Sequence, residues 1–138
     1  MSCLSWSEKW SESLSSSRAI VPRNCRLFLA VEELGAVKRG SWGAAPLDAF
    51  APREGEVVVT HNCNSAFRRT DLEELLDARN VERLHVMGLA TQFSVEHTVR
   101  DAVDIGYRVS VLGRCCASAD PDAHRASLKT MAMLADVL

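Results

Sequence analysis

The sequence predicts an α/β fold whose parallel sheet is covered by helices on both faces. Three short runs rich in β-branched and apolar residues are each followed by a segment with the apolar spacing of a helix. These runs are residues 56–60, 83–88 and 107–112. Strands that alternate with helices form right-handed βαβ crossovers, which produce parallel sheets. Ligands bind beyond the carboxyl ends of such strands, so we expect one site among residues 60–67, 88–94 and 113–118.

The composition is that of one globular domain. The 138 residues are 47% hydrophobic and 25% charged, which separates the chain from disordered and fibrous proteins. Lys and Arg number 16 against 18 Asp and Glu, a balance that offers no basic surface to a nucleic acid. The apolar runs are too short to cross a membrane. The start of the chain has no apolar signal-peptide core, so we expect a cytoplasmic protein with reduced cysteines.

The N-terminal part divides into a low-complexity segment and a helix. Residues 1–21 are rich in serine and follow neither a helical nor a strand period, so we predict that they are disordered. Residues 22–138 form the folded domain. Asn24 is expected to cap a helix that Gly35 ends, and a strand over residues 26–31 is the alternative. The apolar positions of this helix are Leu27, Phe28, Val31 and Leu34.

The middle of the chain predicts two strands and two helices. Residues 56–60, with three consecutive valines, have the composition of a buried strand. Thr70 and Glu73 form a capping box at the start of a helix. Residues 83–88 are the second strand. The helix after it has apolar residues on one face and His97 on its solvated surface. Those apolar residues are Val95, Val99, Ala102 and Val103.

The last third predicts a strand, a helix and the start of a further strand. Residues 107–112 form the third strand. Asp120 is the N-cap of the final helix, and Pro121 occupies its first position, where proline is favourable. His124 is expected on the solvated surface of this helix, and residues 136–138 begin a fourth strand. The apolar side of the helix carries Leu128, Met131 and Leu134.

Several motifs occur together in a fixed order from about Pro22 to the C-terminus. They are residues 35–44, 51–60, 64–67 with 70–72, 88–91 with 95–102, 106–109 and 116–118. In these motifs the chain resembles the isochorismatase-like hydrolases, a family that includes nicotinamidases and carbamoylsarcosine amidohydrolases. The resemblance implies a three-layer α/β/α fold with a parallel sheet. It also implies hydrolysis of C–N (amide or carbamoyl) or vinyl-ether bonds in small molecules, without a cofactor.

The residues that carry catalysis in this family are replaced here. Cysteine-type members use an aspartate, a lysine and a cysteine. In this sequence the lysine position holds His61, the cysteine position holds Ser94 and the aspartate has no counterpart. The segment that should carry the family's first two strands is replaced by the serine-rich start. The resemblance therefore implies an N-terminally truncated member whose first strands are missing or replaced, and whose catalysis is impaired.

The missing strands have a structural consequence as well. In the family topology they lie between the strand at residues 57–59 and the strand at residues 84–87. Their loss would leave backbone hydrogen-bonding groups unpaired along both neighbouring strands. Each buried backbone group without a partner costs about 1–3 kcal/mol. We therefore expect either a rearranged sheet, a partner that covers the gap, or an incomplete copy of a longer ancestor.

Ser94 has two interpretations. As a nucleophile it would use His61 as its base, which requires about 2.6–3.2 Å between the hydroxyl and the imidazole. As a structural residue it would cap the helix that starts at Val95. The resemblance also assigns the oxyanion donors to the backbone N–H groups of Ala90 and Ser94, with a cis peptide bond at Leu89–Ala90.

The remaining expectations concern the pocket, metals and partners. Phe67, Trp42 and Thr91 are the expected pocket-lining residues, with ordinary core packing as the alternative for Phe67. The spacing of the candidate metal ligands fits no zinc pattern, so we predict no metal. Those candidates are His61, Cys63, Cys115 and Cys116. The expected partner is a small-molecule substrate, with a homo-oligomer as a further option. The rival function is a non-catalytic assembly partner of a full-length relative.

Overall fold

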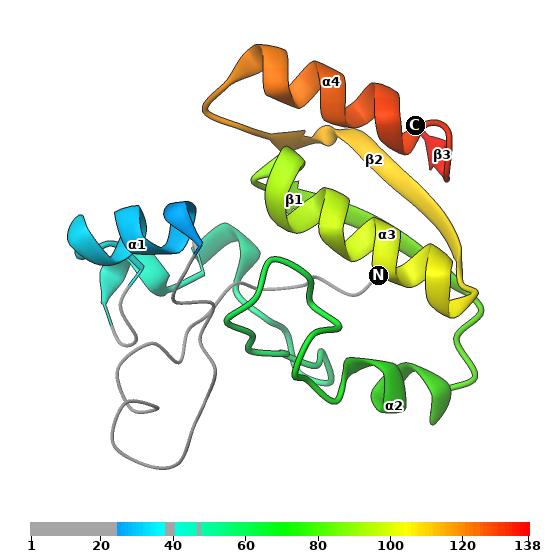
Figure 1. Ribbon diagram of the computed structural model, residues 1–138. Coiled ribbons are helices and arrows are strands. Elements are labelled where there is room, and N and C mark those ends of the chain that lie inside the picture. The colour runs from blue at the N-terminus through cyan, green and yellow to red at the C-terminus, as the bar shows by residue number, and fades with distance from the viewer. Residues whose placement is uncertain (1–24, 38–40, 47) are drawn as a thin grey trace. The chain divides into compact units, whose positions relative to one another are not determined.

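The computed structural model describes residues 25–37, 41–46 and 48–138 (Figure 1). They fall into two compact units, divided between Cys63 and Asn64. We call residues up to 63 the N-terminal unit and residues 64–138 the C-terminal unit, and describe each by itself. The serine-rich segment over residues 1–21 and the expected cap Asn24 lie outside the described residues.

The N-terminal unit contains the predicted first helix. This helix, α1 (Arg26–Glu33), confirms the prediction, and the alternative of a strand there is wrong. It ends at Glu33, and Gly35, just after the C-cap Leu34, has a φ of 61° in the left-handed region that glycine adopts readily. The Gly35 N–H donates to the Glu32 carbonyl at 3.0 Å, and the Ala36 N–H donates to the Val31 carbonyl at 3.1 Å. These two bonds make a Schellman motif, which satisfies the last carbonyls of the helix. Two short 3₁₀ turns follow, Trp42–Ala44 and Asp48–Phe50.

The predicted strand over residues 56–60 is wrong. The described residues of the N-terminal unit contain no strand at all. Val57 and Val58 are exposed, and only Val59 is buried. A β-branched run becomes a strand only where a second strand can exchange backbone hydrogen bonds with it. The described residues of this unit supply no such neighbour, so the three valines form no ladder.

The C-terminal unit is built on a parallel sheet of three strands in the order β1-β2-β3. The strands are β1 (Arg83–Leu89), β2 (Arg108–Ala117) and β3 (Asp136–Val137). All pairings are parallel, which confirms the predicted α/β fold with its second, third and fourth strands. In Figure 1 the long β2 runs between the other two strands.

Strand β2 is longer than the sequence predicts. Val86 pairs with Val111, but Gly88 pairs with Cys116, so one residue of β1 faces four residues of β2 between these pairs. Such an irregularity bends a strand without ending it. Residues 113–117 therefore belong to β2 and not to the loop that we expected there.

Two helices pack together against the sheet. They are α3 (Glu96–Ile105) and α4 (Pro121–Met131), which contact each other and both contact β2 (Figure 1). The predicted cap of α4 is confirmed, because the Asp120 carboxylate accepts the N–H groups of Asp122 and Ala123 at 2.9 and 3.0 Å. The core of the unit includes Val86, Val99, Ala102, Val109, Val111 and Met131.

A third helix, α2 (Leu72–Asp77), confirms the prediction with a different cap. The Thr70 hydroxyl accepts the N–H of Leu72 at 3.3 Å, one residue before the Glu73 N–H that a capping box would use. The same hydroxyl donates to the Ala66 carbonyl at 2.5 Å. Throughout the described ranges, no helix combines the length and apolarity that a bilayer span demands.

Candidate functional site

The candidate site is the turn that joins β1 to α3. The Leu89–Ala90 peptide bond is cis, as the resemblance implies. Residues Thr91–Val95 then form a single π-helical turn that continues directly into α3. The Val95 N–H donates to the Ala90 carbonyl at 3.5 Å, which is the five-residue spacing of a π-helix, and the Phe93 N–H donates to the same carbonyl at 3.0 Å. We call residues 89–95 the Leu89–Val95 turn; it brings the expected oxyanion donors, Ala90 and Ser94, onto one short segment.

Ser94 does not cap a helix. Ser94 lies inside the π-helical turn Thr91–Val95, whereas a capping residue flanks a helical segment. Val95 is the N-cap of α3, Ala90 is the N-cap of the π-helical turn, and neither end has a side-chain cap bond. The capping interpretation of Ser94 is therefore wrong.

The Ser94 hydroxyl is instead buried without a partner. The residue is 6% exposed, and its Oγ accepts or donates no hydrogen bond within the described C-terminal unit. An unsatisfied buried hydroxyl costs about 1–3 kcal/mol, so each such group calls for an explanation. Ser94 lies in the helical turn that begins at Thr91, and the first N–H groups of a helical segment have no partner within it and attract negative charge. A bound polar molecule would satisfy both the hydroxyl and these N–H groups.

Thr91 is fully buried, and its polar groups are held by α4. Its Oγ1 lies 2.8 Å from His124 Nδ1, and its carbonyl accepts the Ser127 hydroxyl at 3.3 Å. His124 is half-buried, so the expectation that it is solvated is wrong. The sequence could not reveal these contacts, because they join residues 33 and 36 positions apart. His97, by contrast, is exposed as predicted, and its Nδ1 donates to the Phe93 carbonyl at 2.7 Å.

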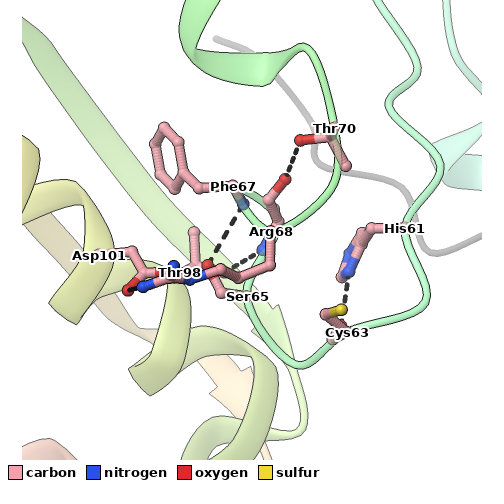
Figure 2. Close-up of polar contacts among 9 residues, drawn as sticks. His61, Cys63, Ser65, Phe67, Arg68, Thr70, Thr98 and Asp101 are labelled. Atoms are coloured by element: carbon pink, nitrogen blue, oxygen red, sulfur yellow. Dashed lines mark hydrogen bonds and ion pairs between the residues drawn. The ribbon is translucent and has the colours of Figure 1, made fainter. Parts of the chain in front are cut away.

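His61 belongs to the N-terminal unit, where its ring is held by the backbone. Its Nδ1 lies 2.7 Å from the Cys63 carbonyl (Figure 2). A carbonyl only accepts, so Nδ1 carries the proton and the lone pair of the neutral ring is on Nε2. Burial lowers the pKa of His61, and the bond to Cys63 only partly offsets this. His61 is therefore a neutral imidazole at pH 7. The units that hold His61 and Ser94 have no determined relative position, so their pairing stays a prediction.

Hydrogen bonds hold the segment over residues 65–70 against α3 (Figure 2). The Arg68 guanidinium donates two bonds to the Asp101 carboxylate, at 2.9 and 3.1 Å. The Ala66 N–H donates to Thr98 Oγ1 at 3.1 Å. Burial raises the pKa of Asp101, but hydrogen bonds from Arg68 and Ser65 outweigh it and leave the pKa below its ordinary value. These bonds fix where Phe67 lies.

The two aromatic residues expected to line the pocket lie in different surroundings. The Phe67 ring stacks on Tyr107, with centroids 6.0 Å apart and the planes 26° from parallel. Tyr107 directly precedes β2, at the amino ends of the strands, whereas the Leu89–Val95 turn follows the carboxyl end of β1. Trp42 is in the N-terminal unit and is exposed. The lining roles of Phe67 and Trp42 stay predictions.

The described residues offer no obvious metal centre. No three His, Cys, Asp or Glu side chains converge anywhere in the described ranges. No disulfide joins the cysteines described by the structure. Cys116 is buried, and burial raises the pKa of its thiol, so it stays protonated at neutral pH.

Comparison with known families bears directly on this turn and its sheet. The family model described as the isochorismatase domain matches residues 11–138. The chain belongs to the isochorismatase family. The cis peptide at the end of β1, the helical turn after it and the parallel sheet agree with the resemblance that the sequence motifs indicate.

Three similar proteins illustrate the extent of the match. The ureidoacrylate amidohydrolase RutB of Methylobacterium radiotolerans is 38% identical over 91 residues, which cover 65% of this chain and 35% of RutB. The maleamate amidohydrolase of Pseudomonas putida is 35% identical over 85 residues, covering 62% of this chain and 40% of that protein. The crystal structure of a cysteine hydrolase from Pseudomonas syringae pv. phaseolicola superposes with a TM-score of 0.72 and 30% identity, covering 80% of this chain and 57% of that one. The chain thus matches between about a third and three-fifths of the length of these relatives.

Proposed function

We propose that this member of the isochorismatase family binds small amides or carbamoyl compounds at the Leu89–Val95 turn and hydrolyses their C–N bond only slowly. The observation that carries the proposal is the Ser94 hydroxyl, which is buried and unpartnered in its unit just before α3. This hydroxyl and the backbone N–H groups around it form a polar site that a carbonyl compound would complete.

Binding and catalysis make different demands on this turn. A carbonyl oxygen would accept N–H groups of Ala90 and Ser94, which would also stabilise the negative charge that develops on attack. Attack itself needs an activated nucleophile. A serine hydroxyl is activated by an adjacent base, whereas a thiol ionises readily at the start of a helix. Ser94 has no base within hydrogen-bonding distance in the C-terminal unit. We therefore expect the turn to bind the substrate but to cleave it slowly.

An amide substrate suits the chain better than a vinyl ether. The curated relatives reported above are named for action on two amides, ureidoacrylate and maleamate. We therefore propose a small amide or carbamoyl compound as the ligand.

Hydrolysis assays on two variants test this proposal. The native chain, Ser94→Ala and Ser94→Cys are incubated with maleamate, ureidoacrylate or nicotinamide, and the release of ammonia is followed. The native chain and Ser94→Ala should be equally slow, because the hydroxyl is not activated. Ser94→Cys should form an acyl adduct at position 94 that mass spectrometry detects. Rapid release by the native chain that Ser94→Ala lowers by about a hundredfold or more would contradict the proposal. Loss of the same activity in His61→Ala would then support a Ser94–His61 hydrolase.

A second function, assembly through the sheet edge, is favoured by the position of β1. In the described sheet β1 pairs only with β2, so along its other edge its backbone N–H and C=O groups pair with no strand of the described residues. Leu89 at the end of this strand is exposed as well. We propose that a second copy of the chain or a full-length relative pairs there. Analytical ultracentrifugation should find a dimer of the purified chain or a complex with the relative, and a monomer in both experiments would count against assembly.

A further inference from the structure

Two side chains of α4 hold Thr91 at both its backbone and its side chain. Ser127 Oγ lies 3.3 Å from the Thr91 carbonyl oxygen, and His124 Nδ1 lies 2.8 Å from Thr91 Oγ1. Thr91 and Ser127 are both buried, so water does not compete for these bonds. The contacts join α4 to the residue that follows the cis peptide and begins the π-helical turn.

The same network reaches the first turn of α3. Ser127 Oγ also lies 2.7 Å from Glu96 Oε2, and Glu96 Oε1 accepts two bonds from Arg100 at 3.0 and 2.7 Å. A hydroxyl has one proton, so the shorter bond to the Glu96 carboxylate is the stronger of the two and the bond to the Thr91 carbonyl is the weaker. The negative charge of Glu96 is favourable at the start of a helix. Ser127 is therefore fixed from one side by Glu96 while it faces Thr91.

The bond to the Thr91 carbonyl also bears on the direction of the next backbone N–H group. A peptide unit is planar, and its C=O and N–H point in opposite directions. The Thr91 carbonyl also accepts a backbone N–H from the start of α3, so Ser127 adds a second bond to a peptide plane whose Gln92 N–H points away from α4. The bond to Thr91 Oγ1 prevents the same residue from rotating about its side chain. Together the two bonds restrain Thr91, the residue at which the helical turn starts and from which the backbone leads to the Ser94 N–H.

We propose that Ser127 and His124 are positioning residues, which hold the Leu89–Val95 turn so that its backbone N–H groups face a negative charge at the Ser94 side chain; this rests on the function proposed above. Neither residue touches the ligand. They act through Thr91. An apolar contact between α4 and the turn could fill the same space, but it would not fix the direction of a peptide plane.

The ionisation of a thiol at position 94 measures this alignment without any activity. In the full chain carrying Ser94→Cys, the rate of alkylation by iodoacetamide is measured against pH, with the peptide that contains position 94 identified by mass spectrometry. Aligned N–H groups stabilise the thiolate and lower the pKa of the thiol. Adding Ser127→Ala or His124→Ala should raise that pKa by about one unit, which slows alkylation about tenfold at a pH below it.

Matched variants separate positioning from packing. Thr130→Ala removes another hydroxyl of α4, but this one donates to the Ala126 carbonyl of its own helix at 3.0 Å and should leave the alkylation profile unchanged. His124→Asn keeps a group that can bond Thr91 Oγ1, so it should restore part of the effect that His124→Ala removes. Circular dichroism checks that each variant is folded, and His124→Ala provides the test if Ser127→Ala is not.

Two results would overturn the proposal. One is an unchanged alkylation profile in folded variants of Ser127 and His124. The other is an ordinary thiol pKa in Ser94→Cys itself, because α4 would then have no anion-stabilising arrangement to hold. Calorimetric titration of the native chain with maleamate decides the proposed function separately, so failure of binding and failure of positioning are distinguishable.

Discussion

Replacing Met131 with alanine tests the packing of α4 on the sheet. Met131 lies at the end of α4, is 0% exposed and is among the largest fully buried side chains of the described residues. Truncation removes the favourable burial of the side chain beyond Cβ and leaves a cavity, which together cost about 2–5 kcal/mol. A domain is stable by only roughly 5–15 kcal/mol, so the loss is a large fraction of the total. The urea midpoint, followed by far-UV circular dichroism, should therefore fall markedly.

Met133→Ala is the matched control for this substitution. It removes the same atoms two residues further on, where the side chain is 84% exposed. Its free energy of unfolding should stay within about 0.5 kcal/mol of the native value. Equal losses in the two variants would refute the description of α4, because they would show that Met131 is no more buried than Met133.

Three further substitutions probe other contacts of the C-terminal unit, each through the free energy of unfolding. Asp101→Asn should cost about 1 kcal/mol at neutral pH, because the bond to the exposed Arg68 is partly screened. The pKa of Asp101 is lowered when folded, so this advantage should vanish as the pH falls below about 4, and a constant difference would contradict it. Tyr107→Phe should cost about 1 kcal/mol by removing the bond to Asp77. Burial and Asp77 raise the pKa of Tyr107 to about 12, so that cost should persist at neutral pH and decline only above about pH 10. Gly106→Ala should cost about 1–2 kcal/mol because φ is 114°, and unchanged stability would contradict the left-handed turn.

Features that depend on residues adjacent in the sequence could be predicted from the sequence. Asp120 followed by Pro121 predicted the start of α4, and the structure has the cap bonds. Gly35 predicted the end of α1, because the left-handed residue that follows a helix is usually glycine. The parallel order of the C-terminal strands followed from the alternation of strands and helices. The two helix ends depend only on local backbone geometry. The strand order depends only on the right-handed connection between parallel strands.

Features that depend on distant partners could not be predicted in the same way. The three valines of residues 57–59 have strand composition, but a strand forms only beside another strand, and composition does not show whether one is present. Ser94 has the side chain of a helix cap, but the turn before it is already helical, so the hydroxyl is left unpartnered. His124 is polar in a helix pattern, and only the fold shows that it reaches Thr91.

An NMR titration of the native chain tests the central claim, that the Leu89–Val95 turn is an amide-binding site, most directly. Maleamate is added to isotope-labelled protein, and the backbone amide signals are followed residue by residue. Binding at the turn predicts that the signals of residues 89–95 move in a saturable way, since their N–H groups would meet the carbonyl of the ligand. Signals of the turn that stay in place while others move, or a spectrum that does not change at all, would contradict the claim.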